Sequence, residues 1–224
     1  MQSYLVPRPP NDTTPAARAA FDALFDRAAS PAHNGEIDYD LPWPRWQFIC
    51  HIADTRQVIV HGSQDGGIEV FDPRKSNDAH PFGDRKAIFG ASDGLWSMFY
   101  AILDRTNHPM LLVNGAVRIE ENGVMGEPLY FLSISQPALA ARAFRPGMLY
   151  FLPRDGFEPM PAETFGGRRV HVAQWAKLAP ARPIARIRVA PEDFPLLDQI
   201  RGHDDATIFE RVKSDPKGFP WLDP

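Results

Sequence analysis

Short apolar segments of strand type follow one another from Val58 onward, and few helical segments separate them. The clearest of these segments cover residues 58–60, 87–91, 129–133, 147–152 and 185–189. Parallel strands need long crossover connections, usually helices, whereas antiparallel strands can be joined by short turns. The order of the segments therefore predicts an α+β fold with split, mostly antiparallel sheets and flanking helices, and it argues against a doubly wound fold.

Proline supports the same prediction, because 23 of the 224 residues are proline. Proline fixes φ and lacks a backbone donor, so it favours short strands, turns and extended segments over long helices. Residues 1–15, with prolines at positions 7, 9, 10 and 15, are expected to form an extended arm. An apolar fraction of 44% suffices for a sizeable core. We therefore expect residues 16–224 to form one globular domain.

Residues 15–29 show the clearest helical pattern. Thr13 or Thr14 can cap this helix, and Phe21, Leu24 and Phe25 share one face. Further helices are expected at 95–103 and 196–200. Residues 46–52 are compatible with either a helix or a strand, and a helix packed behind the strand at Val58 is favoured. Strands are expected at 110–113 and 116–119, with an Asn-Gly turn between them, and at 170–177 as one alternating segment. The tail shows no pattern beyond packing by Phe219 and Trp221.

Charge and cysteine content exclude several classes of function. A formal charge of −4 provides no global basic face, so there is no strong signal for nucleic-acid binding. Cys50 is the single cysteine and cannot form an internal disulfide, and no cluster predicts a metal site. Residues 203–205, His-Asp-Asp, are typical of an exposed turn. No signal peptide or membrane-spanning run is apparent, which predicts a cytoplasmic protein without membrane contact.

The strand at 58–60 runs directly into His61, Gly62 and Ser63. A strand that ends in this way presents an imidazole, an unobstructed backbone and a hydroxyl at one place. Phe89 follows in a second apolar strand, and Tyr100 stands eleven residues later in a segment of helical pattern. Aromatic residues in such segments are more often core than ligand contacts, so a purely structural role is the competing interpretation.

The ordered set of His61-Gly62-Ser63, Phe82-Gly83, Phe89 and Tyr100 resembles the ADP-ribosyltransferase superfamily. The resemblance is strongest to the poly(ADP-ribose) polymerase-like, or diphtheria-toxin-like, branch, of which the chain would be a divergent member. It covers roughly residues 58–103 and extends weakly to 170–177, where Gln174 stands at the position expected for a glutamate. The resemblance implies an ADP-ribosyltransferase-like fold of split antiparallel sheets, with NAD as the substrate.

The family pattern also implies a role for each matching residue. His61 would bond a ribose hydroxyl of NAD, and the Gly62 backbone would hold the nicotinamide amide, with Ser63 helping to orient it. Phe89 and Tyr100 would enclose the nicotinamide ring by offset stacking, which contributes about 0.5–1.5 kcal/mol for each contact. Arg74 and Lys75 in the following loop could meet the pyrophosphate.

Two departures from the family pattern bear on activity. Phe89 replaces a tyrosine, which preserves the stacking surface, and Gln174 replaces the carboxylate that stabilises an oxocarbenium-like ribose and activates the acceptor. Glu158, Glu163 or Glu192 could supply a carboxylate from a loop. The resemblance therefore implies mono-ADP-ribosyl transfer, with His61 and Gln174 as the catalytic pair, rather than chain elongation.

Three other interpretations stay open. One is a binding module for NAD or ADP-ribose that has lost catalysis, and another is a structural protein whose arm or tail binds a partner. The related RNA 2′-phosphotransferases, which also use NAD, match the spacing of the histidines and arginines less well. The sequence leaves the acceptor and the oligomeric state open.

Overall fold

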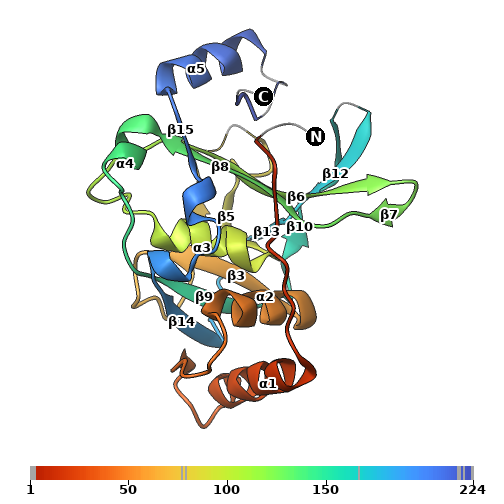
Figure 1. The fold of residues 1–224 in the computed structure, drawn as a ribbon, viewed down its shortest axis with the longest axis vertical. Coiled ribbons are helices and arrows are strands. Elements are labelled where there is room, and N and C mark those ends of the chain that lie inside the picture. Colours follow the sequence, from red (N-terminus) through yellow and green to blue (C-terminus); the bar gives the residue numbers. More distant parts are fainter. Residues whose placement is uncertain are drawn as a thin grey trace.

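The computed structural model describes residues 4–76, 78, 80–165, 167–215, 218 and 220–222, and it has the predicted α+β architecture (Figure 1). Two sheets lie between helix α1 at one end of the molecule and helix α5 at the other. The α-helices are α1 (Pro15–Ala29), α2 (Arg45–Thr55), α3 (Gly94–Ile102), α4 (Gln136–Ala140) and α5 (Asp205–Ser214). Two 3-10 turns, Pro191–Asp193 and Leu197–Gln199, precede α5.

The first sheet, which we call sheet A, contains the long central strands β6 (Leu112–Glu121) and β8 (Leu129–Ser135). Its strand order is β1 (Val6–Pro7), β8, β6, β12 (Arg168–Val172) and β11 (Glu163–Phe165). Strand β7 (Val124–Met125) pairs with β6, and β15 (Arg201–His203) pairs with β8 in parallel. All other pairs in sheet A are antiparallel.

The second sheet, sheet B, is built around β3 (Val58–Ser63), the strand that ends in His-Gly-Ser. Its order is β10 (Glu158–Pro159), β13 (Gln174–Lys177), β5 (Lys86–Ala91), β3, β9 (Gly147–Pro153), β14 (Ala185–Val189) and β2 (Glu36–Ile37). Strand β4 (Arg74–Lys75) pairs with β5 at the margin. Only the β14–β2 pair is parallel, as expected for a chain whose strands are joined mostly without crossover helices.

Helices α1, α2 and α3 pack on one face of sheet B, which we call the inner face. Phe21, Phe48 and Phe151 are fully buried there, and their rings meet edge to face through Phe48. A smaller core, with Ile59, Phe71 and Tyr150, covers the outer face of sheet B. A third core, with Val117, Phe131 and Ile208, joins sheet A to α5. None of the described helices is long and apolar enough to cross a lipid bilayer.

The helix predictions at 15–29, 46–52 and 95–103 are confirmed. Helix α1 begins after Thr14, whose hydroxyl accepts a hydrogen bond from the Ala17 N–H at 3.1 Å. Asp93 caps α3 through a bond from the Trp96 N–H at 2.8 Å. The helix expected at 196–200 is wrong, because residues 191–199 form only the two 3-10 turns.

The turn expected at Asn114-Gly115 is also wrong, since both residues lie inside the continuous strand β6. The Asn114 side chain accepts a hydrogen bond from Trp96 Nε1 at 2.6 Å and is thereby used in tertiary packing. A Cβ at position 115 would lie 2.5 Å from the Phe131 ring, so glycine is needed for packing rather than for a turn. The second Asn-Gly pair, at 122–123, does form a turn, with φ values of 52° and 78°.

Residues 170–177 do not form one strand, because the chain leaves sheet A at Ala173 and enters sheet B at Gln174. The tail also differs from expectation. Residues 205–214 form α5, and His203 is buried rather than part of an exposed turn. Trp221 packs against the core of sheet A as expected, while Phe219 lies outside the described residues.

The N-terminal arm is extended, as predicted, but it is packed along the molecule and not free. Val6 and Pro7 form β1 at the edge of sheet A, and Tyr4 is buried against Phe131. The chain then runs along the side of the molecule to α1 (Figure 1).

Replacement of Phe151 by alanine should cost about 3–5 kcal/mol of unfolding free energy, because the ring is fully buried between α1, α2 and sheet B. The matched control is Phe209→Ala on α5, where the side chain is 61% exposed and the change should be near neutral. Chemical denaturation measures both values, and equal losses would contradict the assignment of the main core.

Candidate functional site

Sheet B places the strands of the predicted site side by side, in the order β13, β5 and β3. His61 lies in β3, Phe89 in β5 and Gln174 at the start of β13. Helix α3, which carries Tyr100, follows β5 directly and packs on β3. Residues separated by up to 113 positions in the sequence, from His61 to Gln174, are therefore collected in one layer of the fold.

Phe89 and Gln174 lie on the inner face of sheet B, the same side as α3. Ala91 is paired with both Val60 and Gln174, and Ala91 and Val60 belong to the main core against the helices. Directly paired residues share a face, as do residues two positions apart in a strand. Tyr100 packs against the same core, so the structure brings Phe89, Tyr100 and Gln174 to one side of the sheet.

His61 points to the opposite, outer face of sheet B. Its ring meets the ring of Phe71 at a centroid distance of 4.8 Å, and Phe71 belongs to the outer core. Strands β3 and β5 pair only at Val60 and Ala91, and the imidazole crosses to β5 beyond that point. There His61 Nδ1 lies 2.6 Å from the Phe89 carbonyl oxygen. The structure thus links His61 to the backbone of Phe89 and not to its ring.

The environment of His61 favours the neutral imidazole. Burial lowers the pKa of His61, and the charge of Arg74 lowers it further, while the bond to the Phe89 carbonyl acts in the opposite direction. A carbonyl only accepts, so the proton resides on Nδ1 and is donated to Phe89. Nε2 is left as an acceptor, and it has no hydrogen-bond partner among the described residues. The arrangement can receive a hydroxyl donor at Nε2.

Phe89 and Tyr100, the two residues expected to stack on nicotinamide, differ in their surroundings. The Phe89 side chain is half-buried, belongs to none of the three cores and contacts no described aromatic ring. Tyr100 lies 6.2 Å from Trp96 and 5.7 Å from Phe99 between ring centroids. Burial raises the pKa of its hydroxyl, while a hydrogen bond with Asn114 opposes the rise. The amide of Gln174 makes no side-chain hydrogen bond within the described part of the chain.

Gly62 and Ser63 are placed differently from the expectation. A Cβ at position 62 would lie 2.0 Å from the Ser97 carbonyl oxygen and 2.8 Å from the Ala101 nitrogen. The side of Gly62 that faces α3 is therefore filled by the helix backbone, and the glycine admits a helix there instead of a ligand. The Ser63 hydroxyl accepts a hydrogen bond from the Asp65 N–H at 3.0 Å and stabilises the following turn.

The charged residues that the sequence offered for the pyrophosphate and for the missing carboxylate lie at different places in the structure. Arg74 and Lys75 form β4 beside β5, and Lys75 is paired with Asp84 at 2.7 Å. Glu163 is engaged by His80 at 2.5 Å. Glu158 in β10 is paired with Ala176 in β13, and Ala176 is paired with Phe89 in β5. The Glu158 side chain therefore lies on the inner face with Phe89.

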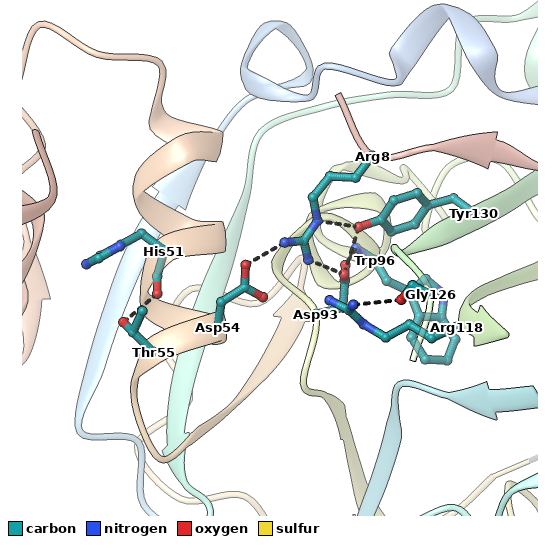
Figure 2. Close-up of polar contacts among 9 residues, drawn as sticks. All are labelled: Arg8, His51, Asp54, Thr55, Asp93, Trp96, Arg118, Gly126 and Tyr130. Atoms are coloured by element: carbon teal, nitrogen blue, oxygen red, sulfur yellow. Dashed lines mark hydrogen bonds and ion pairs between the residues drawn. The ribbon is translucent and has the colours of Figure 1, made fainter. Parts of the chain in front are cut away.

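A buried polar network beside the site was not anticipated from the sequence (Figure 2). Arg8 lies between Asp54 and Asp93, with nitrogen–oxygen distances of 2.5 and 2.6 Å, and its Nε donates to the Tyr130 hydroxyl at 3.0 Å. Tyr130 donates in turn to Asp93 at 2.7 Å. Burial, together with the charge of Asp93, raises the pKa of the Tyr130 hydroxyl. The members of this network, Arg8, Asp54, Asp93 and Tyr130, are distant from one another in the sequence, and none of them was predicted from it.

Among the described residues, no group of three or more histidine, cysteine or carboxylate side chains is arranged to hold a metal ion. Comparisons of the chain with protein-family models, with curated proteins and with solved structures found no match. The geometry of the chain itself is therefore the basis for a functional proposal.

Replacement of Gly62 by alanine should destabilise the protein by about 3 kcal/mol or more, because the added methyl meets the α3 backbone, which cannot move independently. Gly66→Ala is the matched control, since the nearest atom to its Cβ is the flexible end of Met148 at 3.4 Å. Thermal and urea unfolding of both variants test the prediction. A Gly62→Ala protein of wild-type stability would contradict the close packing of α3 on β3.

Replacement of Asp93 by asparagine should cost about 3–5 kcal/mol, because it leaves the buried Arg8 without its buried counter-charge. Asp54→Asn removes the other carboxylate from the same arginine, but Asp54 is 36% exposed and the loss should be below about 1 kcal/mol. The unfolding free energies of the two variants can be compared directly. A larger loss for Asp54→Asn would show that the network depends on the surface partner.

Proposed function

We propose that the protein binds NAD in the manner of an ADP-ribosyltransferase, with the nicotinamide ring between Phe89 and Tyr100. The observation that supports this most directly is the set of unsatisfied groups around β5. The Phe89 ring and the Gln174 amide share the inner face with Tyr100, and in the described part of the chain the ring meets no other aromatic ring and the amide makes no side-chain hydrogen bond. Half-buried groups of this kind are suited to a ligand that supplies the missing contacts.

The chemistry of each group matches a part of NAD. A flat cationic ring is attracted to the electron-rich faces of aromatic side chains and stacks on them. His61 lies on the opposite face of sheet B, so in this proposal it acts indirectly: its neutral imidazole donates to the Phe89 carbonyl and holds the strand that carries the stacking ring. In this proposal Gly62 supports the site indirectly, because it allows α3 to bring Tyr100 close to β3.

Transfer of ADP-ribose breaks the bond between the ribose C1′ and the nicotinamide nitrogen and leaves positive charge on the ribose. A carboxylate stabilises that charge, and the neutral amide of Gln174 stabilises it less. Slow mono-ADP-ribosyl transfer to an acceptor is the activity that we propose. The inner-face position of Glu158 favours this version, because a carboxylate lies two strands from Phe89, a spacing of about 10 Å.

The second candidate is a binding module for NAD or ADP-ribose without catalysis, and the amide at Gln174 favours it. The two candidates share the site and differ only in whether nicotinamide is released. Both predict a requirement for the aromatic pair.

Calorimetric titration with NAD tests binding. The wild-type protein should bind NAD, and Phe89→Ala or Tyr100→Ala should weaken binding about tenfold by removing one stacking face. Phe209→Ala, on the exposed face of α5, is the matched control and should leave the affinity unchanged. The absence of binding at millimolar NAD, in a wild-type protein shown to be folded, would refute both candidates.

Release of nicotinamide, followed by chromatography, separates the two candidates. If the protein is a transferase, release is measurable and rises in Gln174→Glu, since the new carboxylate stabilises the developing charge. If it is a binding module, the wild-type protein binds NAD without release. Release that disappears in Gln174→Ala would exclude the binding module and assign the glutamine a part in the reaction.

A further inference from the structure

A pocket lies where sheet A meets sheet B, beside the N-terminus of α3. It is a cavity of about 190 Å³. Ser92, Arg118 and His171 provide its polar wall, and Met125, Met160 and Trp175 provide an apolar wall. The volume is below the roughly 300–1,000 Å³ of sites for drug-sized ligands, so the cavity suits a small molecule and excludes a whole dinucleotide. Phe89 and Tyr100 do not line it.

Arg118 is the positive group of this cavity without an ion-pair partner among the described residues. Its NH1 donates to the Gly126 carbonyl oxygen at 2.9 Å, a neutral acceptor (Figure 2). The arginines on the neighbouring strand differ, since Arg168 lies 3.5 Å from Glu121 and Arg169 lies 3.4 Å from Glu120. The guanidinium has five N–H donors in a planar fork, so Arg118 retains donors for an anion in the cavity.

The carboxylates nearest to the cavity are already engaged by other cations. Asp93, which lines the cavity, receives hydrogen bonds from Arg8 and Tyr130 (Figure 2). Glu120 is shared by His171, at 2.7 Å, and by Arg169. Arg8 uses all three of its nitrogens on Asp54, Asp93 and Tyr130. The charges of Arg8, Asp93 and Glu120 are therefore compensated within the protein. Arg118 has no carboxylate partner among the described residues.

Ser92 stands at the end of β5 and supplies a second donor. Its backbone N–H is used by the Ala173 carbonyl at 3.0 Å, but its hydroxyl has no partner within the described chain. The apolar wall is accessible from solvent at Met125, which is 44% exposed. Trp175 is held in place by the guanidinium of Arg154, 4.1 Å from the centre of its ring.

We propose that this cavity binds a small organic anion, a carboxylate or a phosphate ester with an apolar body. Arg118 and the Ser92 hydroxyl bind the anionic head, and Met125 and Trp175 contact the apolar part. The site is separate from the proposed nicotinamide site, and it does not depend on NAD binding by the protein.

Calorimetric titrations with phenyl phosphate and benzoate test the proposal, with benzyl alcohol as the neutral probe of similar size. Both anions should bind saturably, and benzyl alcohol should bind at least tenfold more weakly. Arg118→Leu should weaken anion binding about ten- to a hundredfold, because it removes a charged hydrogen-bond donor. The matched control is Arg168→Leu, an exposed arginine paired with Glu121, which should bind the anions as the wild type does.

A second variant keeps the test valid if Arg118→Leu is unstable. Met125→Glu places a negative charge at the exposed rim without disturbing the core, and it should also weaken binding of the anions at least fivefold while the unfolding temperature stays unchanged. Equal affinity for benzyl alcohol and the anions, or wild-type affinity in Met125→Glu, would overturn the proposal. Loss of anion binding in Phe89→Ala would overturn it as well, since the probe would then occupy the nicotinamide site.

Discussion

Two backbone hydrogen bonds at Ala173 join the two sheets, and the arrangement of both candidate sites depends on them. The Ala173 N–H donates to the Ala116 carbonyl of sheet A at 2.9 Å, and its carbonyl accepts from the Ser92 N–H at the end of β5 at 3.0 Å. The chain changes sheets at this residue, so Gln174 enters sheet B already aligned with Ala91. A buried backbone group without a partner would cost about 1–3 kcal/mol, which keeps this junction in one register.

The two candidate sites lie on different sides of this junction. On the inner face, α3 is linked to sheet A by the bond from Trp96 to Asn114 and presents Tyr100 beside the strand of Phe89. At the end of β5, the cavity of Arg118 opens next to the Arg8 network. Removing one member of a buried ion pair is far more costly than the pair is stabilising, so the network is better regarded as a device for holding Asp93 and α3 in place.

Local patterns were sufficient to predict the fold class and the elements at the centre of sheet B, while the short edge strands, α4 and α5 were not predicted. Helix α1, with its threonine cap and aromatic face, and strands β3, β5, β9 and β14 were predicted from residues near in sequence. The sequence could not show that Asn114-Gly115 lies in a strand, because the reason is a distant ring at Phe131. The change of sheet at Ala173 also depends on distant residues. The alternation of apolar and polar residues over 170–177 is the same whether the segment pairs with one sheet or with two.

The roles of the candidate site residues stay predictions, and what the structure adds is their placement. His61, Phe89 and Gln174 lie in neighbouring strands of sheet B, and Tyr100 lies in α3. The face that each side chain occupies could not be predicted, because a shift of one residue in a strand reverses it. His61 therefore turned out to lie opposite Gln174, and Gly62 to pack against a helix. Arg8 had no local signal at all, since its partners are tertiary.

The pairing of β1 with β8 has a consequence for the order in which the molecule assembles. Arg8 bonds to Tyr130, a residue 122 positions later in the chain. The place of Arg8 at the edge of sheet A exists only once Tyr130 and the rest of β8 have been formed. Contacts of such long range are formed late, because closing the loop precedes any gain from the contact. The pairing of β1 with β8 is therefore expected to form late in folding, and until then Asp93 stands without the counter-ion that Arg8 provides.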